Sequence, residues 1–158
     1  DYTVNIWAYA RVDSVQDEFL DGLKEAGINW LCLGIESASD HVRDGALKKY
    51  GNDDIIDVAR RIQGAGINII GNYIFGLPDD NLARMQETLD LALELNCEFA
   101  NFYSAMAYPG SQLYDNAIAG GLELPDTWQD FSQHGYNVKP LSNDHCSAGD
   151  ILEFRVLI

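Results

Sequence analysis

The sequence predicts an α/β fold made of parallel βα repeats. Segments with helical spacing of apolar residues alternate with short stretches that are almost entirely apolar. Such stretches are typical of parallel strands whose two faces are both covered. The tetrapeptide Ala-Gly-Ile-Asn at 26–29 recurs 39 residues later at 65–68. This spacing fits one βα unit, so at least part of the chain repeats the same construction.

The first unit begins with an apolar run over residues 4–9, which predicts a strand with an exposed hydrophobic edge. Apolar residues then recur at helical spacing over 15–26. Ser14 is the expected N-cap of this helix, and Gly27 its expected end. The apolar stretch 28–35 follows as a buried strand.

The later units repeat this order. A helix is expected from about Asp53 to a stop at Gly66, followed by a strand over 67–75. A third helix over 82–95 leads into a strand over 99–105, and a short helix is expected over 40–48. The inward face of the helix that begins near Asp53 is expected to carry Ile55, Ile56, Val58, Ala59 and Ile62.

Four parallel strands in a row fit either an open doubly wound sheet or part of a (β/α) barrel. In both architectures ligands bind at the carboxyl ends of the strands. The loops after Arg11, Ile35, Phe75 and Ala105 are therefore the expected position of a site.

Composition narrows the possible partners. The chain has 10 Lys and Arg against 25 Asp and Glu, a formal net charge of -15. This charge disfavours nucleic acid, because proteins hold nucleic acid largely by neutralising its phosphates with Lys and Arg. No run approaches the roughly 18 apolar residues of a membrane helix, so we expect a cytoplasmic protein without a membrane contact. A small-molecule substrate is the expected ligand.

Cysteine and histidine give no metal spacing. Cys32, Cys97 and Cys146 lie far apart and are expected to be buried thiols. The three histidines also lack the spacing of a metal site; they are His41, His134 and His145.

Several short motifs follow one another at the expected strand ends. They are Ala-Arg-Val-Asp at 10–13, Gly-Ile-Glu-Ser at 34–37, Lys49, Phe-Gly-Leu-Pro at 75–78 and Tyr-Pro-Gly at 108–110. In this order they resemble the third to sixth strands of the radical S-adenosylmethionine (SAM) superfamily. The resemblance implies an incomplete (β/α)6 TIM-like barrel over residues 1–114 and a C-terminal extension over 115–158 that packs on it. It is strongest to the subgroup that often carries a cobalamin-binding domain upstream.

The resemblance also implies roles for single residues. Glu36 and Ser37 match the pair that contacts the SAM ribose, and Arg11 matches an arginine that could bind a carboxylate of SAM or substrate. The pattern Ile74-x-Gly76-x-x-Asp79 matches a motif that supports the adenine, with Asp79 where the family more often has Glu. The strand end that packs on adenine is matched by Ala105, Met106 and Ala107.

Structural roles compete with these assignments. Glu36 could instead cap the short helix that follows it. Arg11 could form an ion pair with Asp13 or Glu36, and Met106 could be a core residue.

The chain does not contain the C-x-x-x-C-x-x-C motif that holds the 4Fe-4S cluster in this family, nor the Gly-Gly-Glu run that receives the SAM amine. We expect both to lie upstream of Asp1 in a parent enzyme that uses SAM and the cluster, and we expect this chain alone to be inactive. The subgroup resemblance implies cobalamin as a further cofactor of the parent enzyme. One alternative is a non-catalytic α/β module that binds a small molecule or a protein at its strand ends. A sugar-phosphate site at Gly76 or Gly110 is a further alternative, and a homodimer through the edge at 4–9 is also expected.

Overall fold

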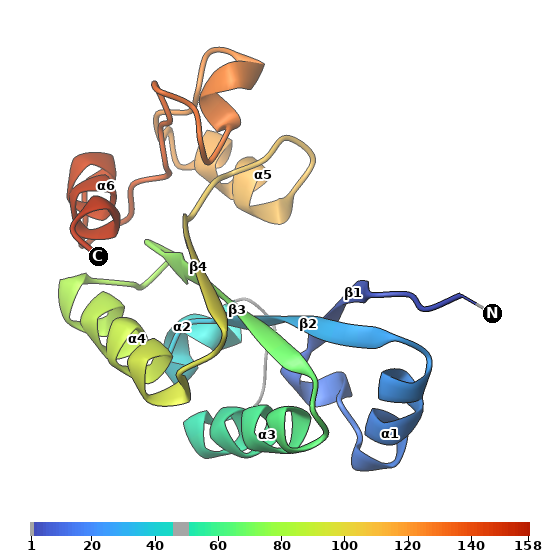
Figure 1. Ribbon diagram of the computed structural model, residues 1–158. Helices are drawn as coiled ribbons and strands as arrows, with labels where there is room; N and C mark the ends of the chain where they lie inside the picture. Colours follow the sequence, from blue (N-terminus) through green and yellow to red (C-terminus); the bar gives the residue numbers. More distant parts are fainter. Residues whose placement is uncertain (1, 46–50) are drawn as a thin grey trace. The chain divides into compact units, whose positions relative to one another are not determined.

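The computed structural model describes residues 2–45 and 51–158 and contains one four-stranded sheet in the order β1-β2-β3-β4. The first two pairings are parallel, with Ala10 opposite Leu33 and Gly34 opposite Asn72. Figure 1 shows the elements in chain order. The strands are β1 (Ile6–Arg11), β2 (Ile28–Glu36), β3 (Asn68–Phe75) and β4 (Phe99–Ser104).

Six α-helices and two 3-10 turns accompany the strands in the described residues. Helix α1 lies between β1 and β2 in the chain, α2 and α3 lie between β2 and β3, and α4 lies between β3 and β4. Their bounds are α1 (Asp17–Glu25), α2 (Asp40–Gly45), α3 (Asn52–Gly64), α4 (Leu82–Leu95), α5 (Gln112–Ala119), α6 (Ala148–Val156), η1 (Val12–Ser14) and η2 (Trp128–Phe131).

The chain divides into two compact units. Unit 1 comprises residues 1–73 and 87–101, and unit 2 comprises 74–86 and 102–158. Strands β3 and β4 and helix α4 each contribute residues to both units. The sequence suggests a different division, between a partial barrel over 1–114 and an extension over 115–158. That division stays a prediction.

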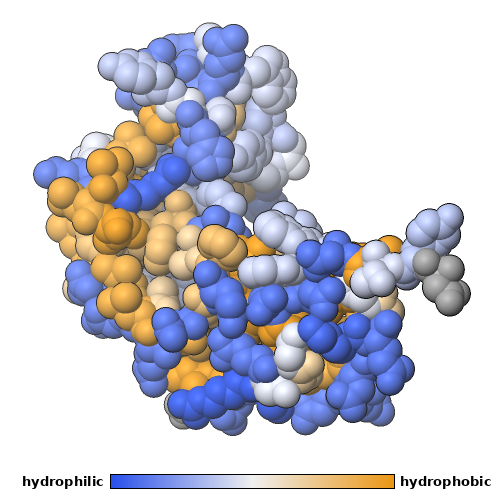
Figure 2. Space-filling view, in the orientation of Figure 1, coloured by the Kyte–Doolittle hydropathy of each residue, from blue (hydrophilic) through white to orange (hydrophobic). Residues whose placement is uncertain are grey.

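The core of unit 1 lies between the sheet and its helices. Leu33 and Ile35 of β2 are fully buried, as are Ile55 and Ile62 of α3. Ile56 is only half-buried, so the predicted inward face of α3 is narrower than the sequence suggested. Helices α1 and α3 lie on the same side of the strands (Figure 1), and their outer surface is mainly hydrophilic (Figure 2).

The repeated tetrapeptide has the same backbone geometry in both places. Gly27 has φ 90° and Gly66 has φ 75°, a left-handed conformation that glycine adopts without steric cost. The Lys24 ammonium donates to the carbonyl of Gly66 and, at 2.8 Å, to Asn29 Oδ1. Lys24 therefore connects the carboxyl-terminal ends of α1 and α3.

One expected helix cap differs in the structure. Ser14 does not cap α1; its hydroxyl donates to the Arg11 carbonyl at 2.8 Å and closes η1, while α1 begins at Asp17. Among the aromatic residues of the C-terminal segment, Phe131 is buried, whereas Trp128 and Tyr136 are exposed. The short helix expected over 40–48 is seen as α2 to Gly45, and Lys49 lies outside the described residues.

None of the helices in the described parts of the chain combines the length and apolar character needed to cross a membrane.

Candidate functional site

Glu36 is the last residue of β2 and has an unusual backbone. Its φ is 71°, a conformation that non-glycine residues seldom adopt. The register of β2 against β3 shifts between Gly34 and Glu36, and Glu36 lies opposite Tyr73. A bulge at a strand end re-aims a side chain, and such strained residues cluster at functional sites. The positive φ and the register shift therefore make Glu36 a candidate functional residue.

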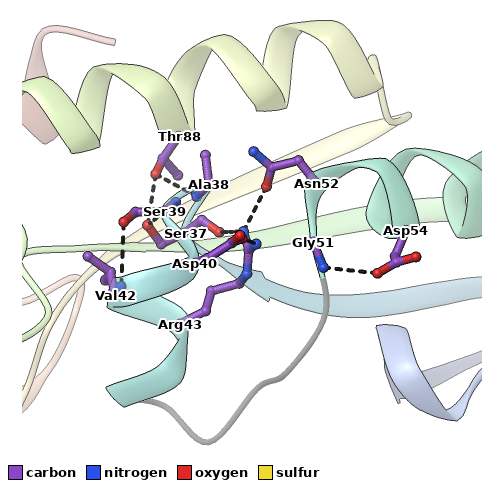
Figure 3. A network of polar contacts seen from close by, with 10 residues as sticks. All are labelled: Ser37, Ala38, Ser39, Asp40, Val42, Arg43, Gly51, Asn52, Asp54 and Thr88. Carbon is purple, nitrogen blue, oxygen red and sulfur yellow. Dashed lines mark hydrogen bonds and ion pairs between the residues drawn. The ribbon is translucent and has the colours of Figure 1, made fainter.

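Ser37, the predicted partner of Glu36, is fully buried. Its hydroxyl lies 3.2 Å from the hydroxyl of Thr88 on α4, and the same Thr88 oxygen accepts from the backbone N–H of Ala38 at 3.0 Å. Figure 3 shows these contacts. The Ser37 side chain thus holds the strand-end loop to α4, and its contact with a ribose stays a prediction.

A buried arginine that the sequence interpretation missed completes this network. The Arg43 side chain is 0% exposed and donates to the Ser37 carbonyl, to Asn52 Oδ1 at 2.8 Å and to the Asp40 carboxylate. It links the end of β2 with α2 and the start of α3 (Figure 3). In sequence, Arg43 looks like an ordinary polar residue of a surface helix, so no local pattern could have identified it.

Arg11 forms an ion pair with Asp13, the structural alternative to ligand binding. Its Nε and Nη2 donate to the two carboxylate oxygens of Asp13 at 2.9 and 2.8 Å. Both side chains are about half exposed. The pair uses the Nε–Nη2 edge of the guanidinium, and a contact of Arg11 with a ligand carboxylate stays a prediction.

The end of β3 in unit 2 carries the next motif. Gly76 has φ 79°, and a Cβ built on it would lie 2.4 Å from Cδ1 of Ile151 on α6. Its backbone N–H donates to Asp80 Oδ2 at 2.9 Å, and Asp80 Oδ1 accepts from Asn81 N–H at 3.0 Å. Asp80 is fully buried. The carboxylate that supports this turn is therefore that of Asp80.

Asp79, the acid that the motif comparison selected, has a different place. It is exposed, its φ is 65°, and its carbonyl accepts from the guanidinium of Arg84. Its side chain is displayed at the strand end, while Asp80 holds the turn. Direct support of adenine by Asp79 stays a prediction.

The remaining predicted residues also lie in unit 2. Ile74 is half-buried in β3, and Ala105, Met106 and Ala107 are all buried just after β4. The backbone N–H of Ala105 donates to the Phe75 carbonyl at 2.7 Å, and the Ala105 carbonyl accepts from Leu141 at 2.9 Å. Met106 is only 6% exposed, which agrees with the core role that competed with ligand contact.

The cysteines do not fit an iron–sulfur cluster. Burial raises the pKa of the Cys32 and Cys146 thiols, and burial together with the Glu98 charge raises that of Cys97 to about 11. Cluster ligands are three thiolates grouped around the iron. Among the described residues no group of three His, Cys, Asp or Glu side chains could hold a metal ion.

The model of the radical SAM superfamily matches residues 7–92. An uncharacterized methyltransferase of Pyrococcus horikoshii is 30% identical over 125 residues, which are 79% of this chain and 27% of that protein. The heme chaperone HemW of Bacillus subtilis is 30% identical over 122 residues, 77% of this chain and 32% of that protein. The chain thus spans about a third or less of the length of these relatives.

Solved structures give the same fold. The cobalamin- and cluster-bound methyltransferase TsrM of Kitasatospora setae has a TM-score of 0.59 at 20% identity, covering 63% of this chain and 20% of that one. HemN of Escherichia coli has a TM-score of 0.62 at 17% identity, covering 79% and 36%. The fold is part of a parallel (β/α) barrel, and the chain belongs to the radical SAM superfamily.

Proposed function

We propose that this chain supplies the ribose and adenine side of a SAM site in a radical SAM enzyme. The observation that carries the proposal is Glu36, an acid in a left-handed conformation at the carboxyl end of a parallel strand. A carboxylate accepts hydrogen bonds from the two hydroxyls of a ribose. The adenine contacts that the family resemblance implies for Ile74, Gly76, Asp79 and 105–107 are a separate part of the proposal.

The cluster ligands belong outside the 158 residues of this sequence, because its cysteines do not fit them. When bound, the 4Fe-4S cluster would supply the electron that cleaves SAM. In this proposal the residues of the present chain bind and orient SAM, and the chain alone is inactive.

The reaction is narrowed by two similarities. One relative is named a methyltransferase, and a structural neighbour is a methyltransferase that holds cobalamin. We therefore favour methyl transfer to a small molecule, with cobalamin as a further cofactor of the whole enzyme and a cytoplasmic location. The net charge of -15 makes RNA the less favoured substrate.

Calorimetric titration of SAM into the full-length natural protein tests the proposal. Glu36→Gln is expected to weaken SAM binding about 10- to 100-fold, because hydrogen bonds to a charged group contribute about 1.5–3 kcal/mol. Glu94→Gln, a change at an exposed acid of α4, is the matched control and should leave the affinity unchanged. Equal affinities of the wild type and Glu36→Gln would reject the ribose role.

The same titration separates the alternatives. A wild-type protein that binds no SAM would favour the non-catalytic module. Saturable binding of inorganic phosphate, with no binding of SAM, would favour the sugar-phosphate site.

A further inference from the structure

We propose that Arg43 and Thr88 are positioning residues that hold Glu36 in its ligand-binding conformation. The inference rests on the proposed SAM role of Glu36 and adds the means by which the fold maintains it. The contacts of Arg43 and Thr88 that carry it lie within unit 1 and are drawn in Figure 3.

The first step is the backbone at the end of β2. Glu36 has φ 71°, a left-handed conformation that is sterically unfavourable for a residue with a side chain. The next residue turns back at once, since the Ser37 N–H donates to the Ile35 carbonyl at 3.0 Å. Strained backbone persists only where the surroundings fix it on several sides. Something must therefore hold the residues beside Glu36.

Two side chains from different helices do so. Arg43 of α2 donates to the Ser37 carbonyl, and Thr88 of α4 bonds both the Ser37 hydroxyl and the Ala38 N–H. All three atoms belong to the two residues that follow Glu36. The contacts thus fix the backbone immediately after the strained position.

A contribution to the stability of the fold is a weak explanation for the buried position of Arg43. The Arg43 side chain is 0% exposed, whereas its carboxylate partner on Asp40 is 74% exposed. Removing a charge from water is costly, and apolar residues often replace buried ion pairs without loss of stability. A guanidinium, however, offers several donors in a fixed plane. Arg43 uses them to join the Ser37 carbonyl with Asn52 Oδ1 at the start of α3.

Thr88 offers a matched pair of variants for the test. Thr88→Val keeps the shape of the side chain but removes the oxygen that contacts Ser37 and Ala38. Thr88→Ser keeps that oxygen and loses a methyl group. If Thr88 positions Glu36, the affinity for SAM should fall about tenfold in Thr88→Val and less than about twofold in Thr88→Ser.

A double-mutant cycle distinguishes positioning from a general loss of stability. Calorimetric titration of SAM into the full-length protein would compare Thr88→Val in the wild-type and Glu36→Gln backgrounds. We expect Thr88→Val to weaken binding in the wild type and to change it less than about twofold once the carboxylate is absent. Equal fold-changes in the two backgrounds would overturn the inference while leaving the SAM role of Glu36 intact.

Arg43→Lys serves if Thr88→Val does not fold. Lysine keeps the charge, but its one nitrogen would have to replace both Nη1, which bonds the Ser37 carbonyl and Asn52, and Nη2, which bonds Asp40. Its cycle with Glu36→Gln should show the same loss of effect, and additive effects would again overturn the inference. If Glu36→Gln itself leaves SAM affinity unchanged, the proposed function fails and the positioning role fails with it.

Discussion

Gly76 offers a sharp test of how the end of β3 is packed in unit 2. An alanine at this position would place its Cβ 2.4 Å from Cδ1 of Ile151 and 2.9 Å from its Cγ1. Gly76 also has φ 79°, so any side chain there is strained irrespective of space. Gly76→Ala therefore carries two separate penalties, one from the backbone and one from packing.

The free-energy costs of the backbone strain and of the packing clash can be separated. A left-handed conformation costs an alanine about 1–2 kcal/mol. Overpacking a tight core costs typically about 1–3 kcal/mol more. We expect Gly76→Ala to lower the free energy of unfolding by about 2–5 kcal/mol. Gly110 is the matched control, because its φ is 87° but nothing lies within 4 Å of a Cβ built on it. Gly110→Ala should cost only the backbone part.

Urea unfolding of the two variants, followed by circular dichroism, measures the difference. The denaturation midpoint should fall further for Gly76→Ala than for Gly110→Ala, with an unchanged slope. The clash should also be partly relieved when Ile151→Val removes the atom nearest to the new methyl group. Equal losses for the two glycine variants, or strictly additive effects of Gly76→Ala and Ile151→Val, would refute the packing argument.

Three further predictions concern reactivity, pH and association. Cys97, with its pKa raised to about 11, should react with iodoacetamide at pH 8 far more slowly in the folded protein than in urea, and fast labelling seen by mass spectrometry would contradict this. Bonds from the Ser147 hydroxyl and N–H hold the pKa of Asp150 below its ordinary 3.8. The cap of α6 should therefore be fully formed above pH 3.8 and weaken as the pH falls through the lowered value, as amide exchange can show; Asp150→Asn should abolish that dependence. The β1 edge, where Trp7 is 58% exposed, should pair two copies in solution, and Trp7→Lys should shift light scattering to the monomer. A monomeric wild type at high concentration would rule this pairing out.

Local patterns predicted the elements well because the physical causes of these elements are local. The apolar spacing over 82–95 gave the bounds of α4, and Gly27 and Gly66 end their helices in the expected left-handed conformation. Leu33 is fully buried, as the uninterrupted apolar stretch of β2 requires. The start of α1 failed because Ser14 could cap either a helix or the preceding turn, and its bonds to Arg11 decide the matter.

The site was predicted only in part because its supports are distant in sequence. Thr88 lies 51 residues from Ser37, so no spacing rule connects them. Arg43 is indistinguishable in sequence from an exposed helical arginine, although its side chain is buried. At the end of β3, the N–H groups of Gly76 and Asn81 donate to the Asp80 carboxylate, a turn contact that no motif indicated, while the role of Asp79 toward adenine stays a prediction.

The two strand ends share one local arrangement, which explains why adjacent polar residues were hard to tell apart. Glu36 and Asp79 both have positive φ, at 71° and 65°, and each is followed by a fully buried polar residue. Ser37 and Asp80 anchor the turn with their side chains, and the acid before each is the residue that the SAM proposal assigns to the ligand. Substitutions at either anchor should therefore act on ligand binding through the acid that precedes it.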